Sequence, residues 1–352
     1  MRYLRIDYGE GDLKRIAALF EVLGVYLAAG MVADKIAESL VRWRLATVDD
    51  PFALITAHAT NADLLLATRR LLVIWVLQYG SYFLLIVPLN WWYRRRGLKA
   101  YGLTRAGYSW RWLLFAGLAT AFLSAWPALM HSVVDAIHPL GATVPWRQAL
   151  FDMSWRRWQF WLFAGVLSYA VVPVLEELLY RGYYQRRLAE DWGDAPAIIG
   201  ASCLFVISHR QYFILNAYNV TMVVSLFCLA LGLGTVFAYT RSLIPSMIAH
   251  AIINIPMTPR WQAGLLIVFL VGAVFVFRRG GLALRAVFGN ASVGSSILLA
   301  VVCAVYVIAS QRFAFFAMVG VGLLAVAVVL EYLERRGSLI TLRDRRGALD
   351  KP

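Results

Sequence analysis

The sequence predicts an all-α protein, a polytopic bundle of about ten transmembrane helices, and three observations lead to this fold class. Hydrophobic residues make up 61% of the 352 residues and charged residues only 15%, whereas soluble domains usually carry about 25% charged residues. The apolar residues form runs that approach the roughly 20 residues needed to cross a bilayer. Short basic segments follow many of these runs, as expected of loops on the cytoplasmic side. These features favour a membrane protein over a soluble one.

Ten apolar runs are candidate membrane spans. The fifth is short, so the sequence defines its ends least well. In chain order the runs are 13–33, 71–93, 112–131, 158–178, 195–210, 218–240, 242–258, 261–277, 293–311 and 313–332. Between the third and fourth runs, residues 144–161 interleave Trp with Arg, which predicts an amphipathic segment at the membrane interface.

The basic residues between these runs predict the orientation of the bundle. Clusters of Arg and Lys follow the second, fourth, eighth and tenth runs, Arg241 follows the sixth, and further basic residues precede the first. With ten spans all of these lie on one side, so both termini are expected in the cytoplasm. We expect the membrane to be that of a bacterial or archaeal cell.

The net charge and the cysteines bear on two other functions, nucleic-acid binding and metal binding. The net charge of +14 comes largely from these basic loops, and anionic lipid headgroups explain it without a nucleic-acid partner. Cys203, Cys228 and Cys303 all lie in apolar runs, without CxxC or Cys/His spacing. They are therefore interpreted as buried free thiols rather than metal ligands. The sequence does not indicate an oligomeric state.

Ionisable residues inside or beside membrane spans are candidates for function, because burying charge in a bilayer is costly. Glu21 stands alone in the first span, with no obvious partner in the sequence. His58, His131 and His138 are interpreted as solvated or interfacial. The remaining candidates, which recur at helical spacings, are Glu176, Glu177, Arg181, His209 and His250.

The stretch "EELLYR" at 176–181 gives its two adjacent glutamates different environments. Glu177 and Arg181 are four residues apart, with the acid first, which favours an ion pair on one helix face. Glu176 lies five residues from Arg181, roughly 140° around the helix, so it needs a partner from elsewhere. A partly desolvated carboxylate without a local cation suits a general base.

Two further stretches place histidines on separate helices. "FVISH" puts Phe205 and His209 one turn apart, and "HAIIN" does the same for His250 and Asn254. A single membrane histidine usually forms a hydrogen bond that holds helices together. Combined with Glu176, these residues can supply a base, an orienting imidazole and donors for an oxyanion.

At these residues the chain resembles the CPBP family of membrane proteins, the CAAX proteases and bacteriocin-processing enzymes also called the Abi family. The family motifs EExxxR, FxxxH and HxxxN/D are matched in order at 176–181, 205–209 and 250–254. The resemblance extends over about 71–257 and includes the basic loop at 94–105. It implies a glutamate-type intramembrane endopeptidase that needs no metal or other cofactor.

The resemblance also implies a role for each motif residue. Glu176 and His209 would activate water, and His250 and Asn254 would stabilise the oxyanion. Glu177 and Arg181, with Phe205 beside them, would support the site. The substrate would be a prenylated, lipid-tethered or membrane-anchored peptide or protein.

The resemblance divides the chain into four regions. They are an N-terminal span and loop (1–70), a protease core (71–257), extra C-terminal spans (258–335) and a basic cytoplasmic tail (336–352). Two other functions remain open at this stage. One is a metalloprotease that uses the same Glu and His residues as zinc ligands, although the chain contains no HExxH motif. The other is a non-catalytic immunity or scaffold protein of the same fold.

Overall fold

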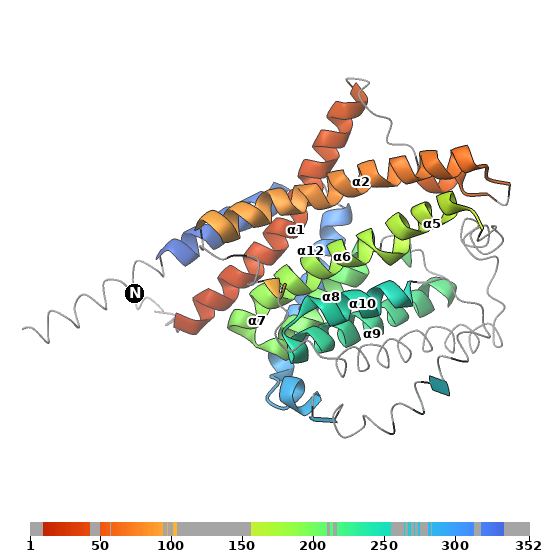
Figure 1. Ribbon diagram of the computed structural model, residues 1–352. Coiled ribbons are helices and arrows are strands. Elements are labelled where there is room, and N and C mark those ends of the chain that lie inside the picture. The colour runs from red at the N-terminus through yellow and green to blue at the C-terminus, as the bar shows by residue number, and fades with distance from the viewer. Residues whose placement is uncertain are drawn as a thin grey trace, which may run out of the picture.

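The computed structural model describes most of the predicted core and parts of both flanks (Figure 1). The described residues are 10–42, 50–56, 58–93, 97, 101–103, 156–209, 212–213, 217–254, 264, 267–268, 271, 274, 281–282, 284–312 and 318–333. The predicted span 112–131, most of the span 261–277, most of the interfacial segment 144–161 and the tail 336–352 lie outside them. His131 and His138 also lie outside.

All regular elements in the described ranges are helical, which confirms the all-α prediction. The α-helices are α1 (Glu10–Arg42), α2 (Asn61–Val87), α5 (Trp158–Ala164), α6 (Val171–Glu177), α7 (Arg186–Trp192), α8 (Asp194–Ser208), α9 (Ala217–Thr240), α10 (Leu243–Ile253), α12 (Val293–Arg312) and a helix over Met318–Leu333. A 3-10 turn, η1 (Pro51–Leu54), precedes α2, and π-helical segments are η2 (Pro88–Tyr93), η4 (Gly165–Tyr169) and η5 (Leu178–Gln185).

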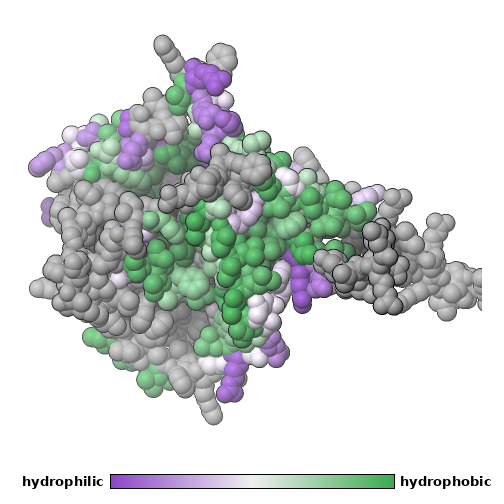
Figure 2. All heavy atoms as spheres, turned by 180° about the vertical axis from the view of Figure 1, so that it is seen from behind, coloured by the Kyte–Doolittle hydropathy of each residue, from purple (hydrophilic) through white to green (hydrophobic). Residues whose placement is uncertain are grey.

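Four helical stretches in the described ranges are long and apolar enough to cross a membrane: Asp12–Arg42, Asn61–Trp91, Trp158–Trp192 and Asn219–Thr240. Exposed apolar side chains cover their outer faces, as with Val76, Leu84 and Val87 on α2. On the face in Figure 2, hydrophobic side chains cover the middle and hydrophilic ones gather toward the edges. The chain is therefore an integral membrane bundle. The predicted number of ten spans is not tested by the described residues.

The helical stretch that begins in the fourth predicted span, 158–178, is longer than that span. Helical segments continue to Trp192, beyond Arg181 and Arg187. Arg181 is 2% exposed and Arg187 is 7% exposed. Each arginine is paired with a buried carboxylate, so neither charge has to leave the helix bundle to be neutralised.

A sharp turn at Gly193 reverses the chain between α7 and α8. Gly193 has φ +85°, a conformation that glycine adopts without the penalty of a side chain. Glu176 lies 17 residues before this turn and His209 lies 16 residues after it. Because α7, η5 and α8 pack together as a helical hairpin, Glu176 and His209 lie at a similar depth. The longer helix thus brings the two motifs to one level, which the predicted span 158–178 could not do.

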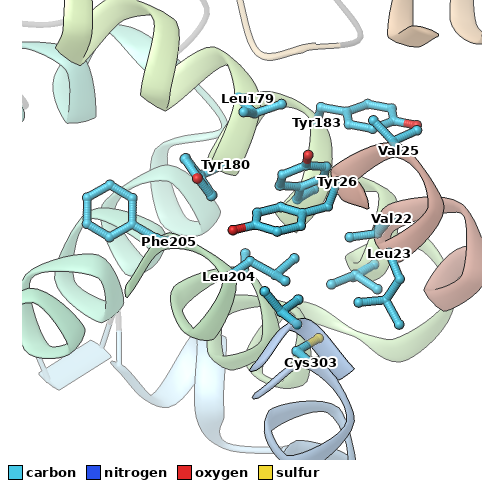
Figure 3. Packing of buried hydrophobic residues seen from close by; sticks show 14 of the residues in the cluster. Val22, Leu23, Val25, Tyr26, Leu179, Tyr180, Tyr183, Leu204, Phe205 and Cys303 are labelled. Atoms are coloured by element: carbon cyan, nitrogen blue, oxygen red, sulfur yellow. The ribbon is translucent and has the colours of Figure 1, made fainter. Parts of the chain in front are cut away.

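The main core forms where α1, η5, α8 and α12 meet (Figure 3). Val22 and Tyr26 of α1 face Leu204 of α8, and Cys303 enters from α12. Cys303 is fully buried with a free thiol, and Cys203 and Cys228 are also free thiols. The core fixes the motif hairpin against helices on both sides of it in the sequence.

Glu21 is not the isolated carboxylate that the sequence suggested. Arg187 Nε donates to Glu21 Oε2 at 2.8 Å, and Tyr183 Oη donates to Oε1 at 2.6 Å. The guanidinium of Arg187 also bonds to Asp191 at 2.6 Å. The partners of Glu21 lie more than 160 residues away, so local spacing could not reveal them. This network joins α1 to the motif helix.

Candidate active site

Glu176 stands in the last turn of α6, where a π-helical segment begins immediately beyond the motif glutamates. π-helical turns shift the direction of side chains and are frequent at functional sites. The residue is 8% exposed. Tyr79 Oη donates to Glu176 Oε1 at 3.1 Å, and His250 Nε2 lies 3.5 Å from Oε2. No guanidinium or ammonium group in the described residues pairs with Glu176.

Glu177, by contrast, has a cation of its own. Arg181 Nη1 donates to Glu177 Oε1 at 2.9 Å, as the spacing predicted. His250 Nδ1 lies 2.8 Å from the same oxygen, and the nitrogen must donate because a carboxylate oxygen only accepts. Glu177 is 0% exposed, and its second oxygen has no hydrogen-bond partner in the described part of the chain. The predicted division between the two glutamates is thus visible in their contacts.

His250 connects the two glutamates. Its ring presents Nδ1 to Glu177 and Nε2 to Glu176, and the residue is 2% exposed. A separation of 3.5 Å exceeds the usual range of a hydrogen bond between nitrogen and oxygen. His250 Nε2 and Glu176 Oε2 can therefore both bond to a third, small partner. The spacing argument separated the glutamates, but it did not predict that one imidazole lies between them.

Phe205 packs at the centre of the motif residues. Its ring is 4.9 Å from the Arg181 guanidinium, a distance suited to a cation–π contact. The rings of His209 and His250 lie 4.8 Å and 6.0 Å from it, and Tyr180 packs against it edge-on at 5.1 Å. Figure 3 shows Tyr180 and Phe205 side by side at one end of the core. Phe205 therefore contacts both histidines and the arginine of the motifs.

His209 lies at the C-terminal end of α8, where the helix stops. Its Nδ1 lies 2.8 Å from the carbonyl of Phe205, so Nδ1 donates and Nε2 is left as the nitrogen with a lone pair. Ser208 Oγ is 3.3 Å from the same ring nitrogen. The described contacts do not join His209 directly to Glu176. Their nearest connection runs through Phe205 and His250.

Asn254 closes α10 as its C-cap, one turn after His250. Its side-chain amide donates to the carbonyl of Ser168 at 3.1 Å, so one of its two N–H groups is engaged. The bond ties the end of α10 to η4, the segment just before the motif glutamates. The predicted span 242–258 is a helix of only 11 residues, Leu243–Ile253. Asn254 therefore lies at a helix end rather than inside a span.

Sequence reasoning missed one residue that contacts this group, Tyr79 on α2. It lies in the charge-free span 71–93, and a phenolic hydroxyl in an apolar run was its only signal. The structure brings it to Glu176 from 97 residues away. One contact cluster is formed by five of the motif residues, Glu176, Glu177, Arg181, Phe205 and His250. The ring of His209 packs at the edge of this cluster, against Phe205. Asn254 lies at the end of α10, one turn after His250.

The chemistry of this cluster is that of acids, bases and donors held out of water. In the described residues, no group of three or more His, Cys, Asp or Glu side chains is arranged to hold a metal ion. The cluster does contain one carboxylate without a cation, an imidazole between two carboxylates, and an amide with a spare N–H. These are the groups that proton transfer and oxyanion stabilisation require.

Comparisons with known proteins support one family. Residues 157–256 match the family model described as type II CAAX prenyl endopeptidase Rce1-like. Neither the curated proteins nor the solved structures gave a match. The matched segment contains all three motifs and lies within the predicted core 71–257, whose outer limits stay a prediction. The match over residues 157–256 supports a relationship of this segment to the CPBP family of CAAX proteases.

Proposed function

We propose that this protein is an intramembrane endopeptidase in which Glu176 is the general base. One observation supports this most strongly: of two adjacent buried glutamates, Glu177 holds Arg181, whereas no arginine or lysine in the described residues pairs with Glu176. A carboxylate neutralised by an arginine is a poor proton acceptor, whereas one without a cation can take a proton from water. The match to a protease family favours peptide hydrolysis as the reaction.

In the proposed reaction, a water lies between Glu176 Oε2 and His250 Nε2, where the 3.5 Å separation leaves both atoms free to bond to it. Glu176 removes one proton as the water oxygen attacks the peptide carbonyl. The developing oxyanion receives hydrogen bonds from His250 and from the unused N–H of Asn254. The proton then passes to the leaving amine, and a new carboxyl and a new amino terminus are formed.

The donor role of His250 concerns its Nε2 atom. Its Nδ1–H is committed to Glu177, so a hydrogen bond from His250 to the oxyanion requires a proton on Nε2 as well.

His209 is proposed to act with Glu176 on the same water. Because its Nδ1–H is directed to the Phe205 carbonyl, Nε2 is fixed as an acceptor. An acceptor nitrogen at the depth of Glu176 can orient the water or receive its proton. The residue would move toward Glu176 when substrate displaces side chains at the edge of the Phe205 ring.

The proposed substrate is a prenylated, lipid-tethered or membrane-anchored peptide or protein. The motif residues lie in a helical bundle whose outer surface is apolar, so a scissile bond must approach from the membrane. The basic loops between spans suit a membrane with anionic lipids. Both termini are proposed to be cytoplasmic in a bacterial or archaeal cell membrane.

Comparative proteomics of membrane-protein termini tests this proposal in the native cell. Wild-type cells are compared with cells carrying Glu176→Gln, which preserves the size of the side chain and removes the base. A terminus present in wild type and replaced by an uncleaved one in the variant would identify both reaction and substrate. Identical termini in both strains would favour a non-catalytic protein of this fold. Loss of cleavage after addition of a strong chelator would favour the metalloprotease alternative.

A further inference from the structure

We propose that Tyr79 is a positioning residue that orients Glu176 for proton abstraction. The inference rests on the proposed function, in which Glu176 is the base. Tyr79 comes from α2, outside the family-matched residues 157–256, so no motif of that family identifies it here. Its hydroxyl donates to Glu176 Oε1 at 3.1 Å in a buried environment. The bond therefore engages one of the two carboxylate oxygens of Glu176.

The hydrogen bond from Tyr79 makes the two carboxylate oxygens of Glu176 inequivalent. Oε1 accepts from the phenol, and Oε2 faces His250 Nε2 at 3.5 Å. A carboxylate that is held at one oxygen cannot rotate freely, because rotation would break a charge-assisted bond. Oε2 is therefore the oxygen presented to the proposed water. Without the phenol, either oxygen could turn toward water and the carboxylate would sample unproductive directions.

The Tyr79 ring is itself held firmly. It is 4% exposed and packs between Trp75 and Tyr82, with ring centroids 5.7 Å and 6.4 Å away. Tyr82 continues the aromatic packing to Tyr26 of α1 and Tyr184 of η5. A rigid aromatic cluster thus fixes the hydroxyl that fixes Glu176. This arrangement makes α2 a part of the site rather than a neighbouring helix.

The same aromatic cluster contains a second buried tyrosine, Tyr184, whose hydroxyl makes no hydrogen bond to the described residues. Tyr184 is fully buried, but its Oη has no hydrogen-bond partner in the described part of the chain. Removing it deletes an oxygen from the aromatic cluster without breaking a bond. Tyr184→Phe is therefore a matched control for Tyr79→Phe, since both variants keep the ring and lose one buried hydroxyl.

The test measures cleavage by the full-length protein in proteoliposomes, using a substrate peptide found by terminal proteomics. Tyr79→Phe is expected to lower kcat about 10- to 100-fold with KM unchanged, because it removes a hydrogen bond to a charged group. Tyr184→Phe is expected to stay within about twofold of wild type, because an unpaired buried hydroxyl contributes no bond. Thermal unfolding of both variants checks that each is folded.

A double variant distinguishes positioning from packing. If Tyr79 acts through Glu176, then adding Tyr79→Phe to Glu176→Gln lowers the residual rate no further, because the base is already absent. A further drop equal to that of the single variant would overturn the inference. Wild-type kcat in Tyr79→Phe, with Glu176→Gln inactive, would also overturn it and leave the proposed function standing. Full activity in Glu176→Gln would instead reject the proposed function itself.

Discussion

Two buried arginines on one helical stretch each pair with a buried glutamate. The two pairs differ in how many of their polar atoms have hydrogen-bond partners. Glu177 pairs with Arg181 beside the motif histidine, and Glu21 pairs with Arg187 against α1. Both glutamates are almost fully buried, at 0% and 2% exposure. Each pair also contacts another helix, through His250 of α10 at Glu177 and through Glu21 of α1 at Arg187. Burial and ion pairing alone therefore do not separate a scaffold from a reactive site.

The difference lies in unused hydrogen-bonding capacity. Both oxygens of Glu21 are bonded, to Tyr183 and Arg187, and Arg187 also reaches Asp191. Near Arg181, Glu177 Oε2 has no partner in the described part of the chain, and Glu176 Oε2 is 3.5 Å from His250. A satisfied network holds helices together, whereas unused donors and acceptors can bind water and substrate. We interpret the first pair as structural and the second as support for chemistry.

The largest expected effect is that of Glu176→Gln on peptide cleavage. Removing a general base typically costs about 100- to 10,000-fold in rate, and glutamine keeps an acceptor for Tyr79. The cleavage rate should fall by that amount while the melting temperature stays close to that of wild type. Initial rates in proteoliposomes and thermal unfolding in detergent measure the two quantities. A variant that cleaves normally would contradict the assignment of the base.

Glu21→Leu tests the other side of the comparison. Arg187 keeps its bond to Asp191, so the loss of Glu21 should cost somewhat less than the about 3–5 kcal/mol of leaving a buried charge with no partner. The melting temperature should drop clearly, and cleavage per folded molecule should change little. Activity normalised to the folded fraction gives the second value. A large loss of normalised activity would place Glu21 within the chemistry.

Asn254→Ala tests whether the side-chain amide at the end of α10 stabilises the oxyanion. Loss of one oxyanion donor typically lowers kcat about 100- to 1000-fold. The bond to the Ser168 carbonyl would also be lost, so a partial stability change is expected. Asn254→Asp is the control, since it keeps the size but supplies no amide donor. If Asp restored the rate fully, the amide would not be the oxyanion donor.

The smallest effect is expected from an exposed pair, Arg241 with Asp194. Two bonds of 3.0 Å and 2.7 Å join them, yet the Arg241 side chain is 65% exposed. Exposed ion pairs contribute about 0–1 kcal/mol, because water and salt screen them. Asp194→Asn should therefore shift the melting temperature by only a few degrees and leave cleavage unchanged. If the melting temperature fell as much as in Glu21→Leu, burial would not explain the different contributions of these ion pairs to stability.

The sequence predicted those features that depend on local spacing or on apolar runs. The i,i+4 spacing of Glu177 and Arg181 was enough to predict their ion pair, and apolar runs were enough for the helical membrane fold. The partners of Glu21 and Glu176 were not predictable in this way. Arg187 and Tyr79 reach them across 166 and 97 residues, and only tertiary packing brings such positions together.

The burial of Arg187 was not predictable for a related reason. An arginine beside an apolar run normally indicates an exposed position, because an unpaired charge in the bilayer is costly. Here Arg187 is neutralised by a glutamate on another helix. His209 was expected to pair with Glu176 from family resemblance, and that pairing stays a prediction. The observed contacts instead place His250 and Tyr79 on the carboxylate.

The most direct test of the central claim compares Glu176→Gln with Glu21→Gln in one proteoliposome preparation, with a lipid-tethered fluorogenic peptide as substrate. Both changes replace a buried glutamate by its amide, so only the surroundings differ. We predict that Glu176→Gln is folded and inactive, and that Glu21→Gln is less stable but active per folded molecule. The opposite pattern, or equal loss of activity in both, would contradict the distinction between a satisfied scaffold pair and an unsatisfied reactive one.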